Sequence, residues 1–181
     1  IEKEFKVEKE LLLALMGIET NYGKYLGKMD IVSSLATLSY DKRRSDFFTE
    51  ELLILLRLVD KNIIKKEILF GSWAGAFGNF QFMPRTIRNY AIDYNNNKTI
   101  ELKKTEDSFA SAANYLKRVG WSNKITWGRK VYLGNYKNKV KKNKYILLKN
   151  WTSYGILNEK KEKLPQVNIK ARLVIPDNYG K

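Results

Sequence analysis

A single carboxylate stands near the start of the chain, directly after an apolar run: Glu19 follows Leu11–Met16. In a helix, residues three, four and seven positions before Glu19 share its face, and these are Met16, Leu15 and Leu12. Burial on such a face would keep a carboxyl group protonated near neutral pH, as a general acid requires. The sequence predicts Glu19 as a catalytic acid, and the alternative is a structural Glu paired with a Lys or Arg.

A glycine-rich segment, residues 71–84, provides the second set of candidate groups. Its small residues allow the backbone to approach a ligand or a packed helix closely. A polysaccharide cleft needs polar groups beside apolar surface, and Ser72 and Gln81 supply the polar groups. The apolar surface would come from Trp73, Phe80, Phe82 and Met83. The alternative is tight core packing, with Ser72 as a capping residue.

The elements that must position these residues are mainly helices. Apolar periodicity, Pro84 at a first helical position, Thr105 as an N-cap and Gly120 as a left-handed cap support this interpretation. Alternating apolar and polar residues over 163–175 predict a short strand. The predicted fold class is mainly α with a small β element near the C-terminus. The predicted helices cover 7–22, 31–39, 45–61, 84–93, 105–119 and 144–154.

Composition limits the chemistry further. The 181 residues include no Cys and no His, which excludes Cys–His and Ser–His–Asp catalysis, thiolate metal sites and disulfides. The net charge of +15 makes nucleic acid, anionic lipid and acidic cell-wall polymers candidate partners. A lysine-rich solvated surface is the alternative, even for the basic cluster at 137–144. No transmembrane segment is predicted, because no apolar run reaches the roughly 18–20 residues of a span.

Together, the segments 17–23 and 71–84 resemble the membrane-bound lytic murein transglycosylases of the B type, relatives of goose-type lysozyme. In that family a helix ending in Gly-Val/Ile-Glu-Thr-x-x-Gly carries the catalytic Glu. A later Gly-Ser-x-Ala-Gly-Ala-Met-Gly-x-x-Gln-Phe-Met-Pro stretch lines the glycan cleft. Here Phe77 replaces the Met, and Phe80 stands where the family usually has a small or polar residue. The segments 35–40 and 113–116 are also similar to the family.

The resemblance implies a lysozyme-like fold and a lytic transglycosylase activity. The family cleaves the β-1,4 bond between N-acetylmuramic acid and N-acetylglucosamine and forms a 1,6-anhydro sugar without consuming water. Glu19 would be the sole acid and base, although Asp30 or Asp46 stays open as a partner. The residues expected to line the glycan site are Ser72, Gln81, Phe82, Met83, Asn114 and Tyr115.

An Asn-rich loop has the alternating oxygen spacing of an EF-hand-like loop. Some members of the resembled family carry a calcium loop of this kind. Here Lys98 replaces the turn glycine and Lys104 stands at position twelve in place of Glu. These departures favour an ordinary Asn-rich turn over a weak Ca²⁺ site, and the implied reaction requires no cofactor. The candidate ligands are Asp93, Asn95, Asn97, Thr99 and Asp107.

The resemblance also implies an organisation and a location. We expect one transglycosylase domain over 1–181, truncated at the C-terminal end and, in one interpretation, at the N-terminal end, with a small β/loop appendage at 156–181. We expect a monomer that binds peptidoglycan glycan strands in the periplasm or cell envelope, with no nucleic-acid partner. The first alternative is a non-catalytic peptidoglycan-binding module. A basic nucleic-acid-binding domain is the remote one.

Overall fold

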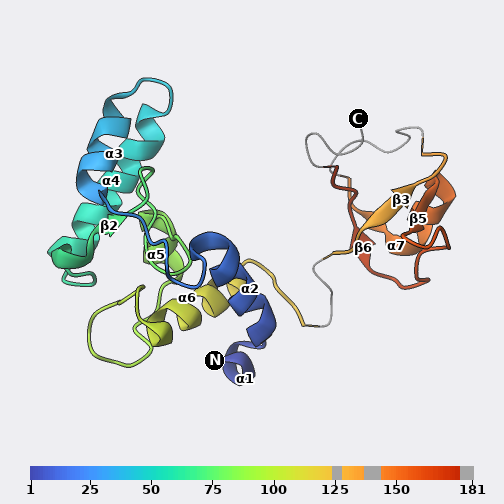
Figure 1. Cartoon of the computed structure of the whole chain (residues 1–181), viewed down its shortest axis with the longest axis horizontal. Coiled ribbons are helices and arrows are strands. Elements are labelled where there is room, and N and C mark those ends of the chain that lie inside the picture. Colours follow the sequence, from blue (N-terminus) through green and yellow to red (C-terminus); the bar gives the residue numbers. More distant parts are fainter. Residues whose placement is uncertain (124–127, 137–143, 176–181) are drawn as a thin grey trace. The chain divides into compact units, whose positions relative to one another are not determined.

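The computed structural model describes residues 1–123, 128–136 and 144–175 of the protein (Figure 1). The chain divides into two compact units, Ile1–Asn123 and Lys124–Lys181. Within the described ranges, no helix combines the length and the apolar composition needed to cross a membrane. Most of the basic cluster predicted at 137–144 lies outside the described residues, and only Lys144 is within them.

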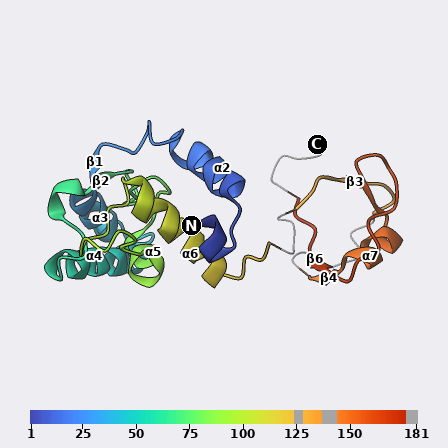
Figure 2. The ribbon, with the colours of Figure 1, turned by 90° about the horizontal axis from the view of Figure 1, so that it is seen from below.

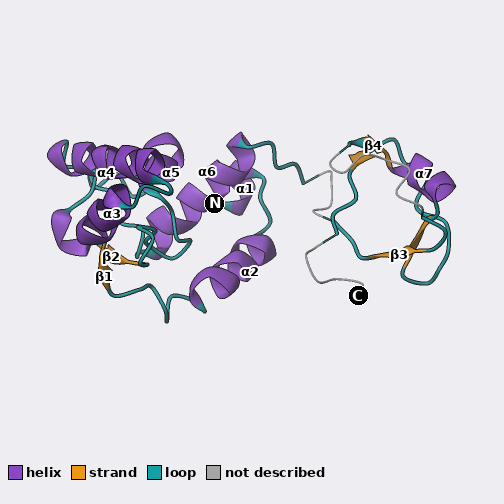
Figure 3. Cartoon of the chain, turned by 90° about the horizontal axis from the view of Figure 1, so that it is seen from above, coloured by secondary structure: helices purple, strands orange, loops and turns teal. Residues whose placement is uncertain are grey.

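The first unit is helical, and its elements confirm most of the predicted helices (Figure 3). The helix predicted at 84–93 ends at Tyr90, because the backbone is already extended at Ala91. Lys104, rather than Thr105, is the N-cap of the last helix of this unit. The elements are α1 (Glu2–Phe5), α2 (Lys9–Thr20), β1 (Met29–Asp30), α3 (Ile31–Tyr40), α4 (Ser45–Asp60), η1 (Lys66–Ile68), β2 (Phe70–Gly71), α5 (Pro84–Tyr90) and α6 (Thr105–Arg118).

The core of the first unit forms where α3 packs on α4 and α5 packs on α6. Leu35 of α3 and Leu55 of α4 are fully buried, as are Ile87 of α5 and Ala113 of α6. Phe77, from the segment between β2 and α5, is buried completely in the same core. The glycine-rich segment is therefore anchored in the centre of the unit.

The α2 helix reaches this core chiefly through Leu12, although an apolar run of this kind is typical of a buried helix. Only Leu12 and Thr20 of α2 are buried, whereas Leu13 is 45% and Ile18 is 80% exposed. The helix contacts α6, whereas Leu13, Ala14, Ile18 and Glu19 are exposed to solvent. The expectation that the run Leu11–Met16 forms a buried helix is therefore wrong. Composition shows that the residues are apolar but not how many neighbouring elements cover them.

The second unit is a small assembly of short strands around α7 (Leu148–Trp151) and η2 (Thr152–Tyr154). In it, β3 (Val131–Leu133) pairs antiparallel with β5 (Ile156–Asn158), and β4 (Ile146–Leu147) pairs antiparallel with β6 (Lys170–Ala171). Its buried apolar residues are Trp151, Ile156 and Leu164.

Two predictions for this unit need correction. The helix predicted over 144–154 is replaced by β4, one turn of α-helix and a 3₁₀ turn that ends at Gly155 in the left-handed conformation. The strand predicted over 163–175 contains only β6. Pairing between β4 and β6 accounts for both differences. It holds residues 146–147 in an extended conformation, so the helix begins only at Leu148, and it places only residues 170–171 of the predicted strand in a sheet. The appendage predicted at 156–181 lies within a larger unit, since β5 pairs with β3. A single domain over 1–181 stays a prediction.

Candidate active site

Glu19 lies one residue before the end of α2, and its side chain is exposed. It makes no hydrogen bond or ion pair within the described part of the chain. The prediction of a carboxylate desolvated by its own helix is therefore wrong. The alternative, a carboxylate locked to a Lys or Arg, is equally absent among the described residues. Glu19 is therefore an open carboxylate within the described part of the chain.

The turn after Glu19 is held in place by Thr20, which is 1% exposed. Its Oγ1 lies 2.9 Å from the carbonyl oxygen of Asn79 and 3.1 Å from that of Met16, and it accepts a hydrogen bond from the backbone N–H of Gly23 at 3.1 Å. These bonds join the end of α2 to the glycine-rich segment. The sequence pattern contained Thr20 but gave no indication of this role.

The glycines of residues 71–84 serve close packing against protein. A Cβ on Gly71 would lie 2.2 Å from the carbonyl oxygen of Ala76. Gly75 has φ +90 and its Cβ would lie 2.4 Å from Leu35, whereas Gly78 has φ +81 and its Cβ would lie 2.5 Å from Leu102. These contacts support the alternative of tight packing for the glycines.

Ser72 and Gln81 are both half-buried and both bind the backbone. Ser72 Oγ accepts a hydrogen bond from the Ala76 N–H at 3.1 Å, as a capping residue does. Gln81 has φ 50, and its Nε2 donates to the carbonyl oxygens of Gly78 at 3.0 Å and Leu26 at 3.4 Å. Gln81 therefore ties the loop that follows Glu19 to the glycine-rich segment.

The β1–β2 pair joins the same two segments a second time, at the start of α3 (Figure 2). Met29 is opposite Gly71 and Asp30 is opposite Phe70. A Cβ on Gly27 would lie 2.1 Å from the carbonyl oxygen of Gly71, so the two backbones are in direct contact. The structure thus brings the end of α2 and its loop together with Ser72 and Gln81.

The other residues predicted to line the glycan site are buried or half-buried, and most of them contact other parts of the protein. Phe82 is 7% exposed and packs edge-to-face on Tyr115, with ring centroids 5.8 Å apart. Asn114 Nδ2 donates to the carbonyl oxygen of Tyr90 at 2.7 Å and links α6 to α5. Met83 is half-buried at the N-cap of α5. Tyr115 is also half-buried, and its hydroxyl makes no hydrogen bond to any described residue.

Exposed aromatic rings are a feature of this site that sequence reasoning largely missed. Tyr22 and Tyr25 follow Glu19 and are 60% and 72% exposed, and Trp73 in the adjoining segment is 66% exposed. Phe70 of β2 is 47% exposed. All four rings offer flat apolar faces, and the Tyr and Trp rings also carry a polar group, which suits contact with sugars. We call these four residues the aromatic surface. Of them, only Trp73 was identified from the sequence.

Asp30 and Asp46, the candidate second carboxylates, occupy helix starts. Asp30 Oδ1 accepts the Ser33 backbone N–H at 2.7 Å, so this side chain is the N-cap of α3. Asp46 lies in the first turn of α4 and is exposed. Neither makes a hydrogen bond or ion pair with Glu19.

The Asn-rich loop is closed by its own hydrogen bonds. Asp93 accepts the backbone N–H groups of Asn97 and Lys98 at 3.0 and 2.7 Å, and Asn97 Oδ1 accepts that of Thr99 at 2.9 Å. Asn95 Oδ1 also accepts the N–H of Asn97, at 3.1 Å.

Asp107, the last candidate ligand, also accepts hydrogen bonds from backbone N–H groups. Asp107 is fully buried and accepts the N–H groups of Tyr94 at 2.9 Å and Glu101 at 2.8 Å. Lys98 takes the position of the turn glycine with φ 72. Among the described residues, no group of three or more Asp or Glu side chains is placed to hold a metal ion. The hydrogen bonds of this loop are those of an ordinary Asn-rich turn, and a weak Ca²⁺ site stays an untested prediction.

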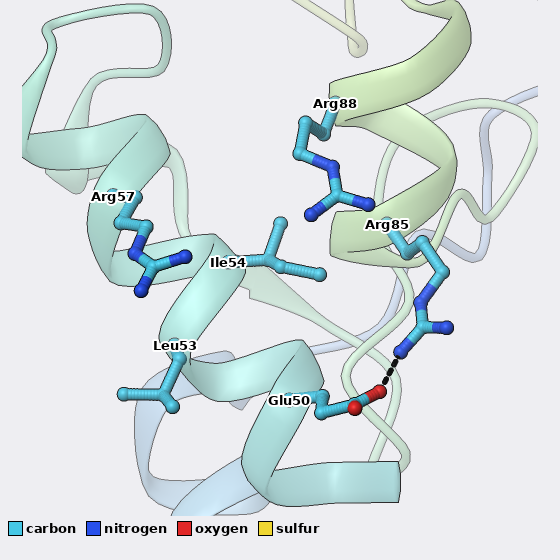
Figure 4. A pocket seen from close by; sticks show the side chains of 6 residues that line it. All are labelled: Glu50, Leu53, Ile54, Arg57, Arg85 and Arg88. Atoms are coloured by element: carbon cyan, nitrogen blue, oxygen red, sulfur yellow. Dashed lines mark hydrogen bonds and ion pairs between the residues drawn. The ribbon is translucent and has the colours of Figure 1, made fainter.

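A further carboxylate, Glu51 on α4, positions α5 through Arg85, whose guanidinium also binds Glu50 (Figure 4). Glu51 is 1% exposed, and it accepts the Arg85 backbone N–H at 2.8 Å and the Arg85 Nε at 3.2 Å. Glu50 binds the same guanidinium, and mainly this hydrogen bond raises the pKa of Arg85. A hollow of about 270 Å³ lies here, but it contains none of the residues predicted for the glycan site. Its lining is Glu50, Leu53, Ile54, Arg57, Arg85 and Arg88.

Comparison with known proteins decides the family. The model of the transglycosylase SLT domain matches residues 1–181. The chain belongs to this family. It is 37% identical over 118 residues to membrane-bound lytic murein transglycosylase B of Escherichia coli, covering 65% of this chain and 33% of that protein.

Solved structures agree. SltB3 of Pseudomonas aeruginosa in complex with NAG-NAM-pentapeptide matches with a TM-score of 0.86 and 31% identity, over 98% of this chain and 49% of that one. The E. coli lytic transglycosylase Slt35 in complex with calcium matches with a TM-score of 0.73 and 28% identity, over 87% and 51%. The chain thus spans between a third and a half of these relatives. The resemblance inferred from the motifs and the mainly helical, lysozyme-like fold are confirmed.

Proposed function

We propose that this protein is a lytic transglycosylase that cleaves the glycan strands of peptidoglycan, with Glu19 as its single acid and base. The observation that carries the proposal is the open, unpaired Glu19 carboxylate, held by Thr20 against the segment 71–84. Family membership supports the same conclusion. A relative, SltB3, has been solved with NAG-anhNAM-pentapeptide, a ligand that carries the anhydro sugar.

The reaction proceeds in two proton transfers. Protonated Glu19 donates its proton to the oxygen that links N-acetylmuramic acid to N-acetylglucosamine, the bond from that oxygen to C1 breaks, and positive charge develops at C1. The C6 hydroxyl of the muramic acid then attacks C1 and returns its proton to Glu19, which closes the 1,6-anhydro ring. The nucleophile belongs to the same sugar, so its effective concentration is high and no second carboxylate is needed.

A glycan strand supplies what the free protein lacks, which is cover over the carboxylate. Sugars stacked on Tyr22, Tyr25 and Trp73 would exclude water from Glu19 and favour its protonated form. The aromatic surface therefore acts as a binding platform beside the acid. We infer that the protein works as a monomer on peptidoglycan in the periplasm or cell envelope and that the reaction uses no cofactor.

The test uses purified murein sacculi and mass spectrometry of the released fragments. We expect anhydromuropeptides from the parent protein and none from Glu19→Gln. Glu10→Gln is the matched control, because Glu10 is an exposed carboxylate in the first turn of the same helix. Its products should equal those of the parent.

A non-catalytic peptidoglycan-binding module is the second candidate, because the exposed rings of Tyr22, Tyr25 and Trp73 would contact a glycan strand with or without turnover at Glu19. This function predicts that the parent protein sediments with sacculi but releases no anhydro product. It also predicts that Glu19→Gln binds sacculi as well as the parent does. Anhydromuropeptides from the parent would exclude it.

A further inference from the structure

Positive charge is distributed unequally between the two units. Residues 1–123 contain nineteen Lys and Arg against sixteen Asp and Glu, whereas residues 124–181 contain fifteen against three. The second unit therefore holds most of the net charge of +15 in about a third of the chain. Charge of this density attracts polyanions and anionic surfaces.

Every Lys and Arg described in the second unit is exposed. Only Lys130 forms an ion pair there with a described residue, at 3.6 Å from Glu159, and both side chains are about two-thirds exposed. Such exposed pairs contribute little, so the cations stay available. These cations are Arg129, Lys130, Lys144, Lys149, Lys160, Lys161, Lys163, Lys170 and Arg172.

Large apolar side chains are exposed among these cations. Lys161 Nζ lies 5.0 Å from the centre of the Tyr132 ring, and Arg172 Cζ lies 5.6 Å from that of Tyr145. Among the described residues of this unit, twice as many large apolar residues are exposed as are buried in its core. The exposed ones, with their exposed fractions, are Tyr132 (44%), Leu133 (43%), Tyr145 (57%), Val167 (40%), Val174 (62%) and Ile175 (43%).

We propose that the second unit binds the surface of an anionic phospholipid membrane. Lys and Arg side chains are attracted to anionic headgroups, and Tyr is enriched at headgroup depth. Leu133, Val174 and Ile175 would enter the boundary between headgroups and acyl chains. A wall polymer or a nucleic acid would use the cations but leave these aliphatic side chains in water. The combination therefore favours lipid, and the attachment is independent of Glu19.

The first test measures sedimentation of the full chain with vesicles of phosphatidylcholine, with or without phosphatidylglycerol. We expect partitioning to be at least about tenfold stronger when phosphatidylglycerol is present and to fall between about 0.1 M and about 0.5 M salt. Equal binding to both kinds of vesicle, or binding to neither, would overturn the proposal. Glu19→Gln should bind vesicles like the parent, so this result is separate from the test of catalysis.

A charge-matched pair of variants locates the binding. The first variant changes four exposed lysines of the second unit to Gln: Lys149, Lys160, Lys163 and Lys170. The control changes four exposed lysines of the first unit to Gln: Lys3, Lys42, Lys61 and Lys65. Both lose the same charge, yet only the first should lose binding, by about tenfold or more. Equal losses would show that net charge alone is responsible and would contradict the proposal.

A third variant separates lipid from soluble polyanions. The double substitution Leu133→Ser and Val174→Ser keeps every cation, and circular dichroism checks its fold. We expect its partitioning to anionic vesicles to fall by about threefold to tenfold, while its binding to polyglutamate and to duplex DNA stays unchanged. Unchanged vesicle binding would show that the unit binds polyanions by charge alone, and the membrane would then not be its specific partner.

Discussion

Two glutamates of the first unit show opposite environments. Glu19, at the end of α2, is exposed and makes no bond to a described residue, whereas Glu51, on α4, is 1% exposed and binds Arg85 twice. The sequence predicted burial for Glu19, which is exposed, and did not single out Glu51, which is buried. Burial thus accompanies a structural role for Glu51, and exposure leaves Glu19 free to meet the ligand that its proposed role requires.

Glu19→Gln should show the largest effect and the sharpest separation of function from stability. Removal of the only acid and base should lower the release of anhydromuropeptides by about 10³-fold or more. Thermal unfolding should change by less than about 0.5 kcal/mol, because an exposed side chain without partners is replaced by one of equal size. A loss of several kcal/mol would instead mean that Glu19 has a structural partner, and the contrast with Glu51 would be lost.

Glu51→Gln should have the opposite profile. The neutral amide cannot serve both the backbone N–H and the guanidinium of Arg85 as a carboxylate does, and the start of α5 loses a favourable negative charge. We expect a loss of about 2 kcal/mol in the free energy of unfolding, measured with urea.

Glu50→Gln is the control for this loss. Glu50 binds the same guanidinium, but its side chain is 63% exposed. Its substitution should cost less than about 1 kcal/mol. Equal costs for the two variants would show that burial does not distinguish these carboxylates.

The sequence predicted the helices of the first unit because the signals that specify each helix lie within it or next to it in the chain. The apolar stripe of α4 repeats every three or four residues, Pro84 begins α5, and Gly120 follows α6 with φ +104. The second unit was predicted poorly because β4 and β6 pair across more than twenty residues, and no local pattern reports such a partner.

The sequence predicted which residues belong to the candidate site but not where their side chains point. The motif identified Glu19, Ser72 and Gln81, and the structure places their segments together. It could not reveal that Gln81 turns its amide to Gly78 and Leu26, or that Phe82 points into the core. These directions depend on contacts between distant segments, which spacing along the chain does not encode.

Thr20→Val tests how tightly the open carboxylate is held. Valine has the shape of threonine but leaves the carbonyl oxygen of Asn79 and the N–H of Gly23 without this hydroxyl. We expect a loss of about 1–2 kcal/mol in stability and a loss of about tenfold in activity, because Glu19 would no longer be fixed against the segment 71–84. Thr37→Val is the control, since its hydroxyl bonds only within an exposed helical turn.

The smallest expected effect concerns Asp30, which caps α3 at the edge of the site. The N–H of Ser33 lowers the pKa of this carboxyl below its ordinary value of 3.8. The charged cap therefore contributes its full stability above that value and loses it as the pH falls through the lowered pKa. Unfolding of the parent and of Asp30→Asn, followed by circular dichroism from pH 6 downwards, should differ slightly above pH 3.8 and converge in stronger acid. A difference that persists undiminished into strong acid would show that the charge of Asp30 is not what stabilises this cap. Asp30 would then be neither an unpaired carboxylate like Glu19 nor a carboxylate whose charge stabilises the fold, as we expect for Glu51.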